Sequence, residues 1–217
     1  SLKLWISNGL EASNQYADVL IIGFLMSPTI AGAYFVTTRI ANAFAQATGA
    51  IYLFSTRHVP RLYYGGKLGE LNGHLDSVAA ATLLIVAGGL LVIFGGGYWL
   101  LRIFNQDYTS YYGALVVLSL GTAAVAAVGP AVPILMLTGH EGRCLSIIGA
   151  TVLMRSVGFF ILIPLFGIYG AVAATAVSFI WMAVMLRNSA VSLAGIDASL
   201  LRLRRRRVSP RISLPAE

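Results

Sequence analysis

Long apolar runs, separated by short polar or proline-containing breaks, dominate the sequence. A helix crosses the hydrocarbon core of a bilayer in about 20 residues, and six runs reach that length. They lie at about 4–26, 29–54, 75–97, 110–137, 144–165 and 168–187. Gly129-Pro130 falls inside the fourth run, where it should kink or break the helix because proline lacks a backbone donor. The pattern predicts an all-α, polytopic membrane protein built as a bundle of six transmembrane helices.

Polar residues interrupt the first two runs at helical spacing. They are Asn8, Glu11, Gln15 and Asp18 in the first run, and Arg39, Asn42 and Gln46 in the second. With 3.6 residues per turn, each set falls on one face of its helix. A charge near the bilayer centre costs about 2.5–3.5 kcal/mol on insertion scales, so we expect both stripes to face protein or water. We interpret them as the wall of a hydrophilic cavity.

The break at Ser27-Pro28 is short, so the first two helices should be antiparallel neighbours with Asp18 and Arg39 at similar depth. An ion pair between them has two interpretations. In the first, the charges only neutralise each other and hold two helices together. In the second, Arg39 and the intramembrane Arg155 attract an anionic substrate, while Glu11 and Asp18 balance the charge or couple transport to a cation.

Small residues and prolines predict how some helices meet. Gly170, Ala174 and Ser178 are spaced four apart and predict a close helix-packing face in the sixth span, without a role in ligand binding. The aromatic segment 98–108 has the pattern of an interfacial segment. The prolines of the fourth span suit either a hinge or a static kink.

Composition supports a membrane protein and offers no catalytic site. Hydrophobic residues make up 58% of the 217 residues and charged residues 11%, with a mean hydropathy of +0.80, whereas soluble domains carry about 25% charged residues. The single cysteine, Cys144, excludes an internal disulfide. The three histidines are scattered over loops without metal-ligand spacing, and no nucleophile or phosphate-loop motif is present. We therefore expect no enzyme activity, no metal and no cofactor.

The formal charge of +7 is distributed as membrane topology requires. One set of helix ends carries twelve of the fifteen Lys and Arg residues, the opposite set carries only Arg102, and Arg39 and Arg155 lie within spans. The positive-inside rule then places both termini in the cytoplasm, and binding to nucleic acid is not expected. The basic tail, residues 191–217, is predicted to be disordered and to act as a topology anchor or to bind anionic lipids.

Several short motifs in order along the chain resemble one transporter family. They are Asn14-Gln-Tyr-Ala-Asp18, Ala31-Gly-Ala-Tyr34 leading to Arg39, Val59-Pro-Arg-Leu62, Leu137-Thr-Gly-His-Glu141 and Pro164-Leu-Phe-Gly167-Ile-Tyr-Gly170. This series resembles the second half of polysaccharide flippases of the multidrug/oligosaccharidyl-lipid/polysaccharide exporter superfamily. The resemblance covers most of residues 10–180.

The resemblance implies a MATE-like transporter with two similar lobes around a cationic cavity, which flips undecaprenyl-diphosphate-linked oligosaccharide across the bacterial inner membrane by alternating access. Six spans correspond to one lobe, and the chain begins with Ser directly at a span. We therefore expect a C-terminal lobe, with an N-terminal six-helix lobe and glycan-assembly membrane proteins as partners. Arg39, Asn42, Gln46 and Arg155 would line the cavity, with arginine binding diphosphate and the amides binding sugar hydroxyls.

Other functions remain compatible with the sequence. A multidrug exporter or a lipid II flippase could use the same fold. A membrane enzyme of glycan assembly would need acidic or histidine residues grouped in an external loop, and the predicted external loops hold only Asp107. A non-transporting scaffold could recruit glycan-assembly enzymes through the basic tail.

Overall fold

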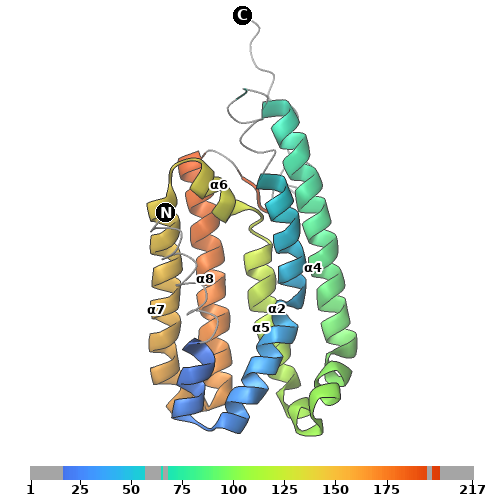
Figure 1. Ribbon diagram of the computed structural model, residues 1–217, viewed down its shortest axis with the longest axis vertical. Helices are drawn as coiled ribbons and strands as arrows, with labels where there is room; N and C mark the ends of the chain where they lie inside the picture. Colours follow the sequence, from blue (N-terminus) through green and yellow to red (C-terminus); the bar gives the residue numbers. More distant parts are fainter. Residues whose placement is uncertain (1–16, 57–64, 66–67, 195–196, 201–217) are drawn as a thin grey trace, which may run out of the picture.

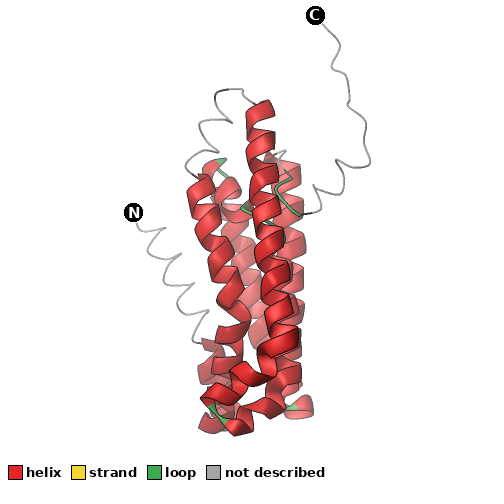
Figure 2. Cartoon of the chain, turned by 90° about the vertical axis from the view of Figure 1, so that its right-hand side faces the viewer, coloured by secondary structure: helices red, strands yellow, loops and turns green. Residues whose placement is uncertain are grey.

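The fold is a bundle of long helices (Figures 1 and 2). A computed structural model describes residues 17–56, 65, 68–194 and 197–200. A helix over residues 17–25 is followed by α2 (Pro28–Thr56), α4 (Leu68–Phe104), the 3-10 helix η1 (Gln106–Tyr111), α5 (Tyr112–Ala126), α6 (Ala131–Leu137), α7 (Glu141–Phe166) and α8 (Ile168–Ala194). No strand occurs among these residues. The predicted all-α class is therefore confirmed for the described part of the chain.

Four stretches of the described chain are long and apolar enough to cross a membrane. They are Gly69–Phe104, Gln106–Leu137, Glu141–Phe166 and Ile168–Leu193. These correspond to the predicted third to sixth spans and support a membrane protein. Helix α2 has the length of a span, but its polar residues lower its hydropathy. Most of the predicted first span, including Glu11, lies outside the described residues.

Successive long helices along the chain alternate in direction, so that α2, α5 and α8 run parallel to one another and α4 and α7 run the opposite way (Figure 1). Helix α7 packs on α8, α8 on α5, α5 on α2 and α2 on α4, as Figure 1 shows from left to right. The end of α2, the start of α4, the α6–α7 connection and the end of α8 lie at the upper end of the view. Arg143 and Arg187 are therefore at one end of the bundle, and Arg102 is at the other, as the charge distribution predicted.

Two boundaries differ from those expected. Helix α4 extends over 37 residues, because no proline interrupts it, and it takes in both the polar residues before 75 and most of the aromatic segment after 97. Residues 98–104 of the predicted interfacial segment therefore belong to α4 and do not form a separate element. The fourth span is broken as predicted, with α5 ending at Ala126 and α6 beginning at Ala131.

The sharp turn into α2 has a local cause. The hydroxyl of Ser27 accepts a hydrogen bond from the backbone N–H of Ile30, and the carbonyl of Ser27 accepts one from Ala31. Pro28 occupies the first helical position, where its missing N–H costs nothing and its fixed φ suits a helix. The Ser27-Pro28 pair therefore begins α2 and sets the helix over 17–25 beside it.

The break between α5 and α6 leaves backbone carbonyls without partners in their own helix, so they require partners elsewhere. The carbonyl of Ala126 accepts a hydrogen bond of 2.6 Å from the hydroxyl of Tyr52 on α2. The carbonyl of Ala127 accepts one of 2.9 Å from the backbone N–H of Leu200. The break is thus supported from two sides, by α2 and by the chain beyond α8.

Small residues allow close approach between α7 and α8, as the spacing of Gly170, Ala174 and Ser178 predicted. A Cβ at Gly170 would collide with the backbone carbonyl of Leu162, and one at Gly158 would approach the Cβ of Ala174 to 2.9 Å. Ser178 is fully buried. On α4, Gly89 makes the same kind of contact with Phe44 of α2.

Residues 197–200, which the sequence assigned to a disordered tail, pack against the bundle. Arg187 of α8 donates hydrogen bonds to Asp197 and Ser199, and the carbonyl of Ala198 lies against Gly129. We call residues 197–200 the C-terminal clasp. The six arginines of the basic tail beyond residue 200 lie outside the described residues.

Gly129 tests whether the clasp and the break fit together as described. Its φ is +74°, a region that L side chains rarely adopt, and a Cβ there would overlap the carbonyl of Ala198. We expect Gly129→Ala to destabilise the protein by about 1–3 kcal/mol. The measurement is thermal unfolding in detergent. Gly142→Ala is the matched control, because a Cβ there meets open space in the first turn of α7, and an equal loss in both variants would contradict the assignment.

Candidate functional site

The most buried charges among the described residues form an ion pair between the first helix and α7. The Nε atom of Arg155 lies 3.1 Å from Oδ1 of Asp18, and both side chains are at most 10% exposed. The N–H bond of Nε does not point at a hydrogen-bond acceptor among the described atoms, although the guanidinium makes further interactions. We therefore treat the Asp18 contact as an ion pair and not as an aligned hydrogen bond.

Arg155 occupies the buried face of α7. The buried residues of this helix recur every three or four positions, as Cys144, Ile147, Thr151, Arg155, Phe159 and Ile163. Arg155 is roughly 17 Å from the nearer end of α7, at 1.5 Å per residue. An apolar residue would fill this position equally well. A charged residue at this depth instead requires a buried partner, because an unpaired charge there is costly.

Aromatic and hydroxyl groups surround the ion pair. The Arg155 guanidinium carbon lies 5.7 Å from the ring centroid of Phe179 on α8. The hydroxyl of Tyr34 on α2 shares a hydrogen bond of 2.8 Å with the hydroxyl of Thr175 on α8, and the Tyr34 ring meets Phe159 edge-on. The cluster joins four helices, which are the helix over 17–25, α2, α7 and α8.

The polar stripe of α2 lies on the outside of the bundle. Arg39 and Gln46 are exposed and Asn42 is half-buried. The guanidinium carbon of Arg39 lies 5.0 Å from the ring centroid of Phe35, and Arg39 makes further interactions. The exposed face is completed by three alanines, Ala43, Ala47 and Ala50. We call Arg39, Asn42, Gln46 and these alanines the α2 polar face.

Lipid-facing surfaces elsewhere on the bundle have a different composition. Exposed large apolar side chains include Leu84, Leu91 and Phe94 on α4 and Leu153 and Phe160 on α7. Between residues 39 and 50 the exposed side of α2 carries no large apolar side chain. The contrast separates the α2 polar face from surfaces that suit contact with acyl chains.

A small pocket joins the ion pair to the α2 polar face. Asp18, Tyr34, Thr38, Arg39 and Asn42 are among its lining residues, and its volume is about 20 Å³. A water molecule requires roughly 10–15 Å³ on this measure, so the pocket has space for about one water. The described residues therefore enclose only a recess of this size beside the α2 polar face, and the larger hydrophilic cavity stays a prediction.

The predicted site residues are distributed between these two places. Arg39 and Asn42 line the recess beside Asp18, Gln46 lies farther along the α2 polar face, and Arg155 is inside the bundle. The ion pair of Asp18 is with Arg155, whereas the sequence predicted Arg39. Glu11 lies outside the described residues.

Tyr34 and Thr175 belong to the buried cluster but were not predicted as site residues. Tyr34 appears in the sequence as one aromatic residue among apolar neighbours, and Thr175 as one small residue in an alanine-rich run. Neither belongs to a polar periodic pattern. Only the crossing of α2 and α8 brings their hydroxyls together.

Comparison with known proteins gives no relative for this chain. No family model, no curated protein and no solved structure matches it. Within the described residues, no group of three or more His, Cys, Asp or Glu side chains could hold a metal ion.

The Asp18–Arg155 pair makes a direct prediction. Replacing one member leaves the other as a buried charge without its ion-pair partner, which costs about 3–5 kcal/mol. We expect Asp18→Asn and Arg155→Gln each to lower the stability of the protein in detergent strongly. The double variant should lose much less than the sum, because it carries neither charge. Additive losses in thermal unfolding of the four proteins would show that the two charges do not depend on each other.

Proposed function

We propose that this chain forms one lobe of a transporter that moves a lipid-linked oligosaccharide across the bacterial inner membrane by alternating access. The observation that carries the proposal is the α2 polar face, which exposes Arg39 and Gln46 on a helix long enough to span a bilayer. The motif resemblance to polysaccharide flippases suggests the same function. In this proposal both termini of the chain are cytoplasmic, in agreement with the positive-inside rule.

The energetics of the bilayer favour a polar environment for this face. An arginine facing acyl chains near the bilayer centre costs about 2.5–3.5 kcal/mol on insertion scales, and the amide of Gln46 adds to that cost. Arg39 lies about 16 Å along α2 from Pro28, too deep for its side chain to be treated as a helix-end residue. Water, substrate or a second lobe in front of the face removes the penalty.

The chemistry of the face suits a diphosphate-linked sugar. Arginine binds phosphate oxygens with paired donors, and the amides of Asn42 and Gln46 both donate and accept hydrogen bonds, as sugar hydroxyls require. The recess beside Arg39 is limited to about 20 Å³. The substrate would therefore bind between this wall and a facing wall, which we assign to the N-terminal lobe of the proposed transporter.

The buried cluster would then act as the support of the wall and not as the binding surface. Asp18 and Arg155 neutralise each other, and Tyr34 ties α2 to α8 through Thr175. The break at Gly129-Pro130 gives the lobe a point where α5 and α6 can change their relative angle. Asp18 remains the candidate for cation coupling, since its carboxylate borders the recess.

The proposal is tested by transport in vesicles that contain the complete protein. The substrate is undecaprenyl-diphosphate-linked oligosaccharide, and the readout is its accessibility to a soluble glycosidase on the far side. A charge-assisted hydrogen bond contributes about 1.5–3 kcal/mol, so we expect Arg39→Gln to slow transport by about tenfold or more. Its stability should change little, because Arg39 is exposed.

Arg102→Gln is the matched control for the same assay. Arg102 is also exposed and also lies beside an aromatic ring, that of Trp99, but it is at the end of α4. Equal transport by Arg39→Gln and the unmodified protein would contradict the proposed role of Arg39. Export of a cationic dye without movement of the glycolipid would favour a multidrug exporter instead.

A further inference from the structure

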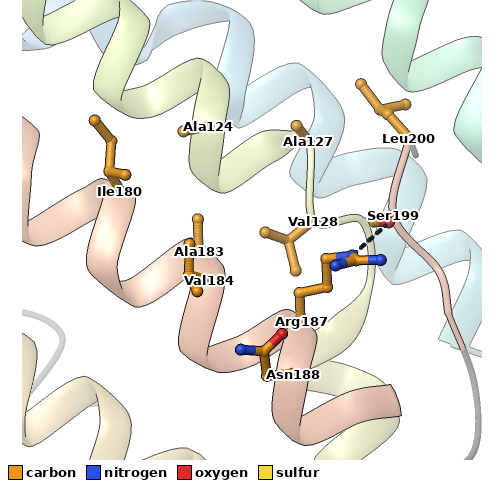
Figure 3. A pocket seen from close by; sticks show the side chains of 10 residues that line it. All are labelled: Ala124, Ala127, Val128, Ile180, Ala183, Val184, Arg187, Asn188, Ser199 and Leu200. Atoms are coloured by element: carbon orange, nitrogen blue, oxygen red, sulfur yellow. Dashed lines mark hydrogen bonds between the residues drawn. The ribbon is translucent and has the colours of Figure 1, made fainter.

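A second and larger pocket lies between α5, α8 and the C-terminal clasp (Figure 3). Its volume is about 330 Å³, within the range of about 300–1,000 Å³ typical of small-molecule sites. It shares no lining residue with the recess beside Arg39. Its existence is therefore independent of the function proposed for the α2 polar face.

The pocket is amphipathic along its length. Apolar side chains of α5 and α8, among them Ala124, Ile180 and Val184, form its walls (Figure 3). Its polar lining residues are Arg187, Asn188 and Ser199, which gather at one end in the same view. The site thus offers one cationic, hydrogen-bonding end and one apolar channel.

The polar end lies at the depth of lipid headgroups. From Ile168 at the start of α8 to Arg187 the helix rises about 28 Å, and the hydrocarbon core is about 30 Å thick. Arg143 at the start of α7 donates a hydrogen bond to Ser189 at the same end of the bundle. Two arginines therefore lie where an anionic headgroup would meet the protein.

Arg187 retains donors for a ligand although it already binds the clasp. Its Nε donates to Ser199 at 3.1 Å and its Nη2 donates to Asp197 at 3.0 Å. A guanidinium has five N–H donors, so these two contacts leave capacity for another acceptor. The Arg187 side chain is 27% exposed.

The carboxylate of Asp197 partly neutralises the positive charge of Arg187. Burial alone would raise the pKa of Asp197, but hydrogen bonds from the hydroxyl and amide of Ser199 and the nearby Arg187 guanidinium hold it below its ordinary value. The carboxylate is therefore charged at neutral pH. It competes with any other anion for Arg187.

We propose that this pocket binds an anionic phospholipid, with the phosphate held by Arg187 and Asn188 and one acyl chain lying between α5 and α8. The apolar walls select a lipid over a soluble phosphate compound, and the arginine selects an anionic headgroup over a zwitterionic one. The clasp forms one side of the site, because Ser199 and Leu200 line it and the backbone of Leu200 is hydrogen-bonded to Ala127.

The test is lipid binding to the purified complete protein in detergent, measured by native mass spectrometry. The probes are phosphatidylglycerol, phosphatidylcholine and inorganic phosphate. We expect phosphatidylglycerol to bind preferentially, Arg187→Gln to weaken it by about tenfold, and Asp197→Asn to strengthen it because the competing carboxylate is removed. Millimolar inorganic phosphate should not displace the lipid.

The opposite effects expected of Arg187→Gln and Asp197→Asn on lipid binding distinguish a lipid site from a purely structural contact. If Arg187 only fastened the clasp, both substitutions would destabilise the protein and neither would change lipid preference, which would overturn the proposal.

A second pair tests the apolar channel. Val184→Phe should reduce lipid binding by filling the pocket, whereas Val177→Phe, two turns away on the same face of α8 and outside the pocket, should not. Equal effects of these two variants would also overturn the proposal.

Discussion

The hydrocarbon core of a bilayer offers no water, so each polar group placed there needs a partner within the protein. This constraint explains the buried ion pair, and backbone groups freed at a helix break near the headgroups are likewise paired within the protein. Where α5 breaks, its last carbonyls bind Tyr52 of α2 and Leu200 of the clasp. Where a charge enters α7, Asp18 lies beside it. The same polar contacts that remove these penalties also join helices distant in sequence, and thereby fix the arrangement of the bundle.

The α2 polar face exposes polar side chains at the surface of the described bundle, although Arg39 also makes interactions within the protein. This face carries an arginine, two amides and small side chains, whereas the exposed surfaces of α4 and α7 carry leucine and phenylalanine. The buried cluster behind it is joined to α7 through the ion pair and to α8 through the hydrogen bond of Tyr34. A buried, paired cluster behind a polar face that is exposed among the described residues supports the proposal that this face is one wall of a transport pathway.

The sequence predicted the helical class and the positions of most helices, because run length and the breaks at Pro28, Pro130 and Gly167 are local signals. It also predicted the close packing at Gly170. It did not predict the partner of Asp18, because pairing between α7 and the first helix depends on how the bundle closes. The short turn at Pro28 favoured Arg39 as the partner of Asp18, because Arg39 is nearer in the chain. The sequence did not predict the clasp, because its contacts are made by a segment of ordinary composition.

The central claim is that the α2 polar face meets water within the membrane, and thiol accessibility tests it most directly. Gln46→Cys is labelled in membranes with a hydrophilic, impermeant maleimide, and Leu91→Cys on α4 is the lipid-facing control. The native Cys144 is fully buried and should remain silent. The account predicts fast labelling at position 46 and none at 91. Equal protection of both positions would contradict it, because the α2 polar face would then be closed to water.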